Sequence, residues 1–501
     1  MINEYGLLEK DTAQEGFLRL QIAAICHCNP PEADFLAEMY RDGHIGIKKD
    51  VKKALYLYEL AANAGWARSV FHLSRIYETG SLEKKKDLKK ANELLHSAAE
   101  LGNANAQYNL ACSYIDGSYG FEKDEKLGYT FLQRAADQSM DAALSYLGYL
   151  YLEGNKPGVV EKDIEKALHY LRSAVDQNET NAIYHLAIMY HEGIGVERDL
   201  KMAFELFERG ASKGISRSQF KIGWFYDKGL WVEADTAKAV SSYQAAADQK
   251  HAGARRNLGI MYNIGRGVTK DQVKATELFQ LAADQGDAHA QVELGLNCMY
   301  GKGTPKDQVK AVECFEKAAK QGLPGGEHHL GLCYLEGTGR EKDLSQAAHW
   351  FHKAADKGHN GSKTELGRMY VSGEGVPQNM HEGLRLLTEA ADAGERGARV
   401  SLAAALLADT AGAYADYKKG FAYLQLAADQ GSLVAKFYLG IGYLSGRGTT
   451  VDYRKGAELC YSCALQGYSK AHEGVRAIYK EGMGVANDAA RAAARYPTSS
   501  S

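Results

Sequence analysis

One sequence pattern returns along this chain every 36 residues, and that regularity limits the fold more than any other feature. The first alanine of a recurring pair falls at Ala246, Ala282, Ala318, Ala354 and Ala390, and the same slot continues at Ala427 and Cys463. A single glycine recurs equally regularly, at Gly193, Gly229, Gly265, Gly301, Gly337 and Gly373. Self-similarity at such a period is typical of stacked repeats, in which each unit buries its apolar face against its neighbours. We therefore expect an array of small units, not one globular core.

Each repeat reads as two amphipathic helices, which residues 254–286 show most clearly. The first apolar stripe recurs every fourth residue, at Ala254, Leu258 and Tyr262. The second has the three- and four-residue spacing of a longer helix, at Ala275, Leu278, Phe279, Ala282 and Ala283. Gly265 follows the first stripe and fits the left-handed position that ends a helix, while Asp271 precedes the second stripe. The repeat is predicted to be a helical hairpin.

Alignment on the first-helix leucine predicts twelve hairpins and the start of a thirteenth at Val475, or about 26 helices. The leucine slots are Leu36, Leu73, Leu110, Leu147, Leu186, Ile222, Leu258, Leu294, Leu330, Leu366, Leu402 and Leu439. We expect a capping half repeat in residues 1–30, the array in 31–487, and a truncated cap helix with a frayed tail in 488–501. The eleventh hairpin has Asp409 in place of the connecting glycine, which is expected to alter its stacking angle.

An acidic column precedes the second helices. Its members are Asp50, Asp87, Asp124, Asp163, Asp199, Asp235, Asp271, Asp307, Asp343, Asp416, Asp452 and Asp488, with Asn379 as the exception. Asp and Asn are both strong N-caps, because their side chains accept hydrogen bonds from the free N–H groups of the first helical turn. Capping therefore explains the column without an acidic ligand site.

Composition excludes several classes of protein. The chain has 60 Lys and Arg against 63 Asp and Glu, so no overall charge draws it to nucleic acid or an anionic membrane. No apolar stretch approaches the roughly 18–20 residues of a membrane span, and the first residues are too charged for a signal peptide. Eight cysteines without recurring pairs favour reduced thiols. These features predict a cytoplasmic protein.

The pattern Ala-x3-Leu-Gly-x2-Tyr-x2-Gly-x-Gly-Val-x2-Asp-x2-Lys-Ala-x6-Ala-Ala-x2-Gly, found over residues 254–286, resembles the Sel1-like repeat, a relative of the tetratricopeptide repeat. The resemblance extends over nearly the whole chain, and the ends of its repeats look like those of bacterial members. It implies an all-α, right-handed α/α superhelical solenoid whose first helices line a concave surface. It also implies an adaptor that holds partner proteins. Secreted members often carry a cysteine pair in each repeat, and this sequence departs from them.

If the first helices line a groove, as the resemblance implies, the inward positions lie two before, two after and five after each leucine slot. The candidate partner-binding residues are then Tyr108, Tyr149, Tyr184, Ile188, Phe220, Trp224, Arg256, Ile260, Asn263 and Met299. Tyr and Trp are enriched among interface anchors, which favours a binding groove. The alternative is that the position two after the leucine packs against the adjacent repeat.

Other residues suggest chemistry only weakly. The Gly-x-Gly turns lack the strand and the Gly-Lys-Ser/Thr ending of a phosphate-binding loop. Cys460 and Cys463 fall in apolar slots of a second helix, which favours buried hydrophobes over a redox pair. The ninth hairpin gathers His328, His329, Cys333, His349 and His352. Because these positions point in different directions, surface histidines are favoured over a zinc site.

The sequence thus predicts a non-enzymatic scaffold that binds a protein or peptide in a concave groove. A narrower alternative is a cytoplasmic immunity or inhibitor protein that wraps one cognate toxin or enzyme. A third is an enzyme or metal protein that uses the ninth hairpin. No catalytic residue, metal site, cofactor, small-molecule substrate, nucleic acid or membrane insertion is expected.

Overall fold

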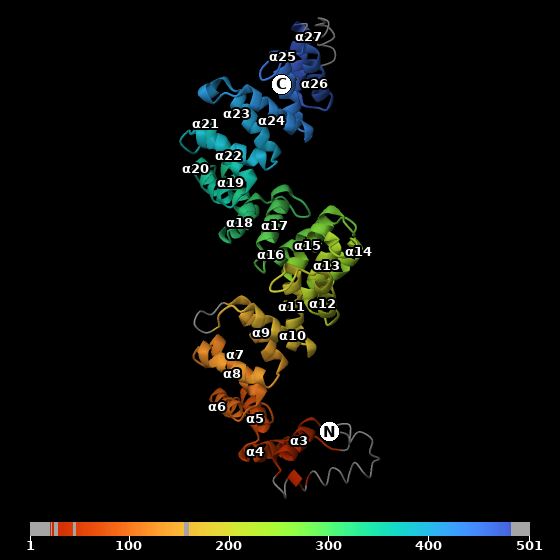
Figure 1. Ribbon diagram of the computed structural model, residues 1–501, viewed down its shortest axis with the longest axis vertical. Helices are drawn as coiled ribbons and strands as arrows, with labels where there is room; N and C mark the ends of the chain where they lie inside the picture. The colour runs from red at the N-terminus through yellow and green to blue at the C-terminus, as the bar shows by residue number, and fades with distance from the viewer. Residues whose placement is uncertain (1–20, 22, 25–28, 44–46, 155–159, 482–501) are drawn as a thin grey trace. The chain divides into compact units, whose positions relative to one another are not determined.

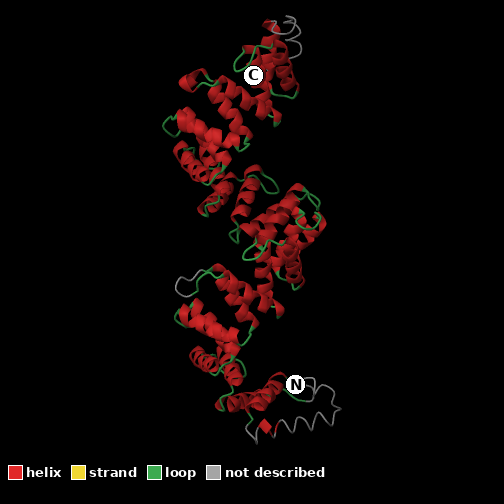
Figure 2. Ribbon diagram, viewed as in Figure 1, coloured by secondary structure: helices red, strands yellow, loops and turns green. Residues whose placement is uncertain are grey.

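The computed structural model describes residues 21, 23–24, 29–43, 47–154 and 160–481. The regular secondary structure of this described part is helical, without a β-strand (Figure 2). The chain divides into two compact units, residues 1–242 and 243–501. Successive helices form hairpins within each unit (Figure 1), so the prediction of an all-α array of helical hairpins is confirmed.

The hairpins alternate first and second helices, nearly all of them 13 residues long. The first helices are α3 (Pro30–Asp42), α5 (Ala67–Thr79), α7 (Ala104–Asp116), α9 (Asp141–Glu153), α11 (Thr180–Glu192), α13 (Ser216–Lys228), α15 (Ala252–Ile264), α17 (Ala288–Tyr300), α19 (Pro324–Glu336), α21 (Asn360–Ser372), α23 (Arg396–Leu407), α25 (Leu433–Ser445) and α27 (Ser469–Glu481). The second helices are α4 (Val51–Asn63), α6 (Leu88–Glu100), α8 (Glu125–Asp137), α10 (Ile164–Asp176), α12 (Leu200–Ser212), α14 (Thr236–Asp248), α16 (Gln272–Ala283), α18 (Gln308–Lys320), α20 (Leu344–Asp356), α22 (Met380–Asp392), α24 (Tyr417–Asp429) and α26 (Tyr453–Leu465).

Local sequence sets both ends of the connection within a hairpin. Gly265 has a φ of +75° and its N–H donates to the carbonyl of Met261, which ends α15 as predicted. Asp271 then accepts the N–H of Lys274 at 2.9 Å and caps α16. The same bond forms at every described member of the acidic column, which confirms its capping role. The last member, Asp488, lies outside the described residues.

The second glycine of the Gly-x-Gly turn joins neighbouring hairpins. Gly303 has a φ of +68°, and a Cβ there would collide with the backbone carbonyl of Gln272 at the start of α16. The loop of the eighth hairpin therefore lies directly on the seventh hairpin. Glycine is required both for the positive φ and for this close approach.

The core lies between the helices of adjacent hairpins. All twelve leucine-slot side chains are at most 7% exposed. In residues 1–242 one continuous cluster runs from Val70 to Phe225. In residues 243–501 the buried side chains form shorter clusters. Those around Phe351 and Leu402 each cover two hairpins, and the one around Leu294 covers three.

The sequence also predicted irregular regions at both ends of the array and at the eleventh hairpin. Most of the predicted capping half repeat in residues 1–30, and all of the predicted cap and tail in 488–501, lie outside the described residues. At the eleventh hairpin, α23 ends at Leu407 and a 3₁₀ segment, Asp409–Tyr414, replaces the glycine turn.

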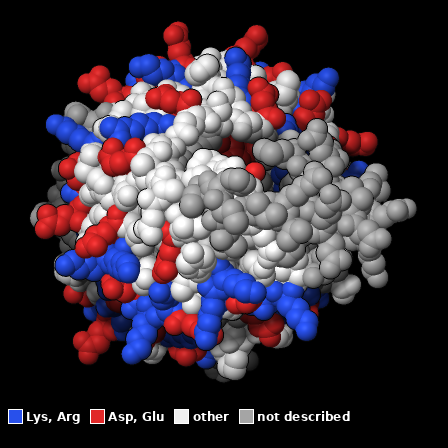
Figure 3. Space-filling model, turned by 90° about the horizontal axis from the view of Figure 1, so that it is seen from below, with Lys and Arg blue, Asp and Glu red and all other residues white. Residues whose placement is uncertain are grey.

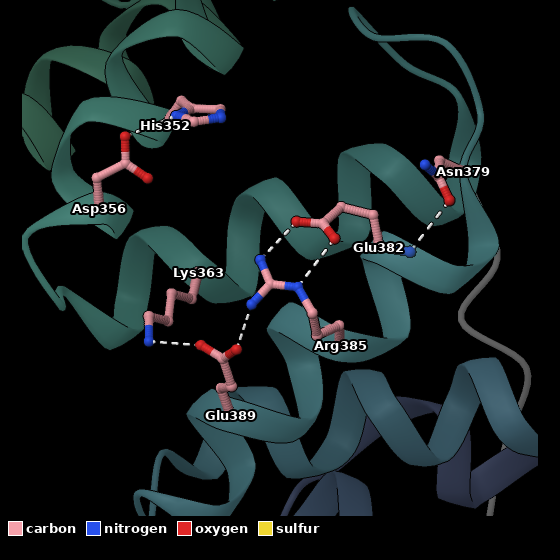
Figure 4. A network of polar contacts seen from close by, with 7 residues as sticks. All are labelled: His352, Asp356, Lys363, Asn379, Glu382, Arg385 and Glu389. Atoms are coloured by element: carbon pink, nitrogen blue, oxygen red, sulfur yellow. Dashed lines mark hydrogen bonds and ion pairs between the residues drawn. The ribbon is translucent and has the colours of Figure 1, made fainter.

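A polar network reinforces the tenth hairpin (Figure 4). Lys363 on α21 binds Glu389 on α22 at 2.7 Å, and Arg385 contacts both Glu389 and Glu382. These contacts hold the pKa values of both carboxyl groups below their usual range: Arg385 is the largest cause at Glu382, and Lys363 at Glu389. The network links the two helices of the hairpin at its surface.

Candidate protein-binding face

A row of aromatic side chains marks the first helices of residues 1–242. Tyr108, Tyr149, Tyr184 and Trp224 lie on α7, α9, α11 and α13, where each is half-buried against the continuous core cluster. They flank the buried leucine slots because residues two positions away on a helix turn toward its neighbouring faces. We call these four side chains the aromatic row.

Histidines connect the aromatic row between hairpins. The ring of Tyr149 on α9 lies 5.0 Å from the ring of His185 on α11, measured between centroids. The ring of His191 on α11 lies 5.3 Å from Trp224 on α13. The anchors therefore also contribute to packing between repeats, as the alternative interpretation requires, while the half-buried rings keep some area open to solvent.

Cationic groups lie on the same face. The guanidinium of Arg217 is 4.7 Å from the ring centroid of Tyr184, and the ammonium of Lys221 is 5.5 Å from that of Trp224. Burial, helped by the charge of Arg217, lowers the pKa of His185 to about 4, so this imidazole is neutral at pH 7. Burial also lowers the pKa of Lys221. The face therefore presents aromatic rings and a few cationic groups whose side chains are held by packing.

The phenol groups remain protonated. Burial raises the pKa of Tyr146 to about 12, and burial with the neighbouring thiol of Cys112 raises that of Tyr108. A protonated phenol can donate a hydrogen bond, so these groups can meet acceptors on a partner.

The ten predicted binding residues fall into two sets, one in each unit. Tyr108, Tyr149, Tyr184, Ile188, Phe220 and Trp224 lie in residues 1–242, and Arg256, Ile260, Asn263 and Met299 lie in residues 243–501; all ten are half-buried. Ile260 and Met299 pack on the cluster around Leu294. Arg256 forms an ion pair with Asp287 at 3.1 Å. The buried amide oxygen of Asn263 has no hydrogen-bond partner in the described part.

Sequence reasoning missed Tyr146, His185 and Lys221, which stand one position before the leucine slot. All three are half-buried and contribute to the face. The available signal was the aromatic or long side chain at this position in three successive hairpins. On a helix it lies about 100° from the leucine, close to the inward residues.

The histidines of the ninth hairpin separate into different surroundings. The Nδ1 of His328 lies 2.9 Å from the Ser362 hydroxyl, and the ring of His329 stacks on Phe315. His352 is exposed and meets Asp356 at 3.0 Å (Figure 4). Among the described residues no three His, Cys, Asp or Glu side chains are grouped so as to hold a metal ion.

Charges of both signs share the visible surface. Figure 3 shows Lys and Arg interspersed with Asp and Glu, as the near balance of 60 basic and 63 acidic residues predicts. Within the described ranges, no helix is both long and apolar enough to cross a lipid bilayer.

Stacked helical hairpins with a recurring pattern define an α-solenoid repeat protein. A model of the Sel1 repeat matches twelve segments, at residues 34–66, 67–103, 104–140, 141–179, 180–215, 216–251, 252–287, 288–323, 324–359, 362–395, 401–432 and 433–468. The chain therefore belongs to the Sel1 repeat family, as the sequence pattern predicted. Sel1 repeats are generally protein-interaction modules, and their solenoids are typically non-catalytic scaffolds.

Solved structures of bacterial proteins resemble the chain. A protective antigen of uropathogenic Escherichia coli with an SLR fold is 28% identical, with a TM-score of 0.69 over 88% of this chain and 93% of that one. A Sel1 repeat protein from Oxalobacter formigenes is 31% identical over 61% of this chain and 87% of its own, with a TM-score of 0.44. An immunity protein from Pseudomonas aeruginosa is 21% identical and is matched over 43% of this chain and 81% of its own. Its TM-score is 0.31, too low to support a functional comparison. No curated protein matched the sequence.

Proposed function

We propose that this chain is a non-enzymatic scaffold that binds a partner protein or peptide on the first helices of hairpins three to six. The observation that supports this function is the aromatic row of α7, α9, α11 and α13. Its rings are held by packing yet keep open area, so they would lose little side-chain entropy on binding. In residues 243–501 we propose Arg256, Ile260, Asn263 and Met299 as a separate set of partner contacts on the first helices of hairpins seven and eight.

The chemistry of the face describes the partner. Flat aromatic rings favour an apolar surface, and the phenols of Tyr108 and Tyr146 favour hydrogen-bond acceptors at its edge. We also propose the cytoplasm as the compartment. Buried single cysteines such as Cys298, Cys314 and Cys333 fit a reducing environment.

The test places a photoreactive amino acid at residue 188 on α11 and, as a matched control, at residue 56 on α4, where Tyr56 is 57% exposed. Crosslinking in bacterial cells is expected to give adducts of defined mass at residue 188 and none at 56. One stoichiometric adduct would favour an immunity or inhibitor role, whereas several would favour an adaptor.

Trp224→Ala then separates binding from packing. If Trp224 is an anchor, the variant binds the captured partner at least about 2 kcal/mol more weakly, the usual threshold for an interface hot spot. Affinity and melting temperature are measured on the same protein. A stable variant with normal affinity would remove the aromatic row from the interface, and a strongly destabilised one would assign Trp224 to the packing between repeats.

A further inference from the structure

A second first-helix surface, on hairpins ten to twelve, differs from the aromatic row because it is hollow. Residues of α21, α22, α23 and α25 enclose an open groove of about 840 Å³. Its walls include Val371, Val400, Ala404 and Tyr438. This volume lies within the range of about 300–1,000 Å³ found for ligand clefts in proteins.

Small side chains create the groove. Val400 and Ala404 stand two before and two after the leucine slot of the eleventh hairpin, whereas Phe220 and Trp224 fill these positions in the sixth. Beneath them Leu387 and Ala405 are buried, so the floor is apolar. Tyr438 is 40% exposed and offers a ring at the side.

The charged side chains that line the groove are positive. Arg368 and Arg396 are among its lining residues, which include no Asp or Glu. Arg368 meets Glu365 at 3.2 Å, but its side chain is 60% exposed and remains open to a second partner. The carboxylate of Glu395, next to Arg396, accepts the N–H of Ala398 at the cap of α23 and is not among the lining residues. The charged side chains that line the groove are thus both cationic, and their guanidinium groups can pair with an anionic group of a ligand.

We propose that this groove binds a short extended peptide of a partner protein, with apolar side chains on the floor and a carboxylate on the arginines. A guanidinium presents paired donors that match a carboxylate. The groove runs over three successive first helices. At 8–10 Å between packed helices it spans roughly 20 Å, the length of about six extended residues. This site is additional to the aromatic row and does not depend on it.

The test uses a displayed pool of random ten-residue peptides, selected in parallel on the full chain and on its Ala404→Tyr variant. Ala404 is exposed, so the tyrosine should fill the groove without disturbing the core. Peptides enriched on the unchanged chain alone are expected to carry Asp or Glu beside Leu, Val or Ala. An absence of such enrichment, or an enrichment of basic peptides, would overturn the proposal.

The most enriched peptide is then labelled, and its affinity is measured by fluorescence anisotropy. Arg368→Glu and Ala404→Tyr should each weaken binding at least tenfold. The matched controls Arg454→Glu on α26 and Ala422→Tyr on α24, both outside the groove, should leave it unchanged. Binding that survives both groove variants but is lost in Trp224→Ala would assign the peptide to the aromatic row and overturn the proposal. If Trp224→Ala no longer binds the partner captured at residue 188 but still binds the peptide, the groove proposal stands and the result applies to the aromatic row alone.

Discussion

The first helices of hairpins three to six and those of hairpins ten to twelve use the same repeat positions in opposite ways. In residues 1–242 the positions beside the leucine slot carry Tyr108, Tyr149 and Trp224, which pack on the core cluster. Tyr149 and Trp224 also contact histidines of a neighbouring hairpin. In hairpins ten to twelve they carry Val400 and Ala404, which leave a groove. The array tolerates both, because the leucine, alanine and capping columns hold each hairpin together. Positions outside these columns are free to determine what the surface binds.

The buried cores of the two units differ in how far each cluster extends along the array. Residues 1–242 contain a cluster that crosses hairpins two to six beside a shorter one over the first two hairpins, whereas the clusters in residues 243–501 cover two or three hairpins. Stability in a repeat array is the sum of unit and neighbour terms. We therefore expect damage to spread farther in the first unit than in the second.

The largest effect should come from truncating the aromatic core. Phe207 and Phe351 occupy the same repeat slot and are both fully buried. Replacing either with Ala should cost about 3–5 kcal/mol, because a cavity replaces a ring. Hydrogen exchange should rise over hairpins two to six for Phe207→Ala and only over hairpins nine and ten for Phe351→Ala. An equally narrow rise in both variants would contradict the difference between the cores.

The next largest loss of stability should come from the glycines at which one hairpin lies on its neighbour. A Cβ at Gly303 would meet the backbone of Gln272, whereas one at Gly195 would meet side-chain atoms of Ile164 and Leu168 and no backbone atom among its nearest neighbours. The positive φ costs either alanine about 1–2 kcal/mol, and the backbone collision should bring Gly303→Ala to roughly 2–4 kcal/mol. Gly286, with positive φ and open space around it, is the control. Equal losses of unfolding free energy at all three glycines would mean that the close approach is unimportant.

Substitutions in the acidic capping column should cost the same stability in both units. Asp163 in the first unit and Asp271 in the second accept the same N–H, three residues on, at 3.0 and 2.9 Å. Each Asp→Ala change should lower the stability of its own hairpin by roughly 0.5–2 kcal/mol. Asp271→Asn is the control and should restore it, as Asn379 caps α22. Chemical denaturation measures these losses, and clearly unequal values would show that capping depends on the surrounding core.

The smallest effect is expected at the ion pairs. Glu382 and Glu389 have lowered pKa values, so their contribution is present above about pH 4.3, the ordinary glutamate value, and is lost as the pH falls through the folded value. Because both carboxylates lie at the surface, with side chains 30% and 40% exposed, Arg385→Ala should cost at most about 1 kcal/mol at pH 7 and less at pH 3. Arg134→Ala, which breaks a pair with Glu100 at 3.3 Å in the first unit, should cost less. Thermal unfolding at both pH values tests this, and a loss that is as large at pH 3 as at pH 7 would contradict an electrostatic origin.

Part of the helix capping escaped sequence analysis. The first helices are capped by side chains of several types, at Asn103, Glu179, His251, Asp287, His359, Glu395 and Ser432. Each accepts the N–H three residues on, as the acidic column does. At Met140, Ile215 and Leu323 the same position makes no such bond. The column was hidden because no single residue type occupies it.

The sequence alone determined the elements of this protein: the hairpins, their leucine and alanine slots, and the second-helix caps. These depend on contacts within about one turn or one hairpin, which a 36-residue period displays directly. Only the tertiary structure showed that Tyr149 lies on His185, that Gly303 touches α16, and that small side chains leave a groove beside Arg368. These features depend on how one hairpin is rotated against the next. That rotation is set by packing between side chains far apart in the chain, which periodicity does not encode.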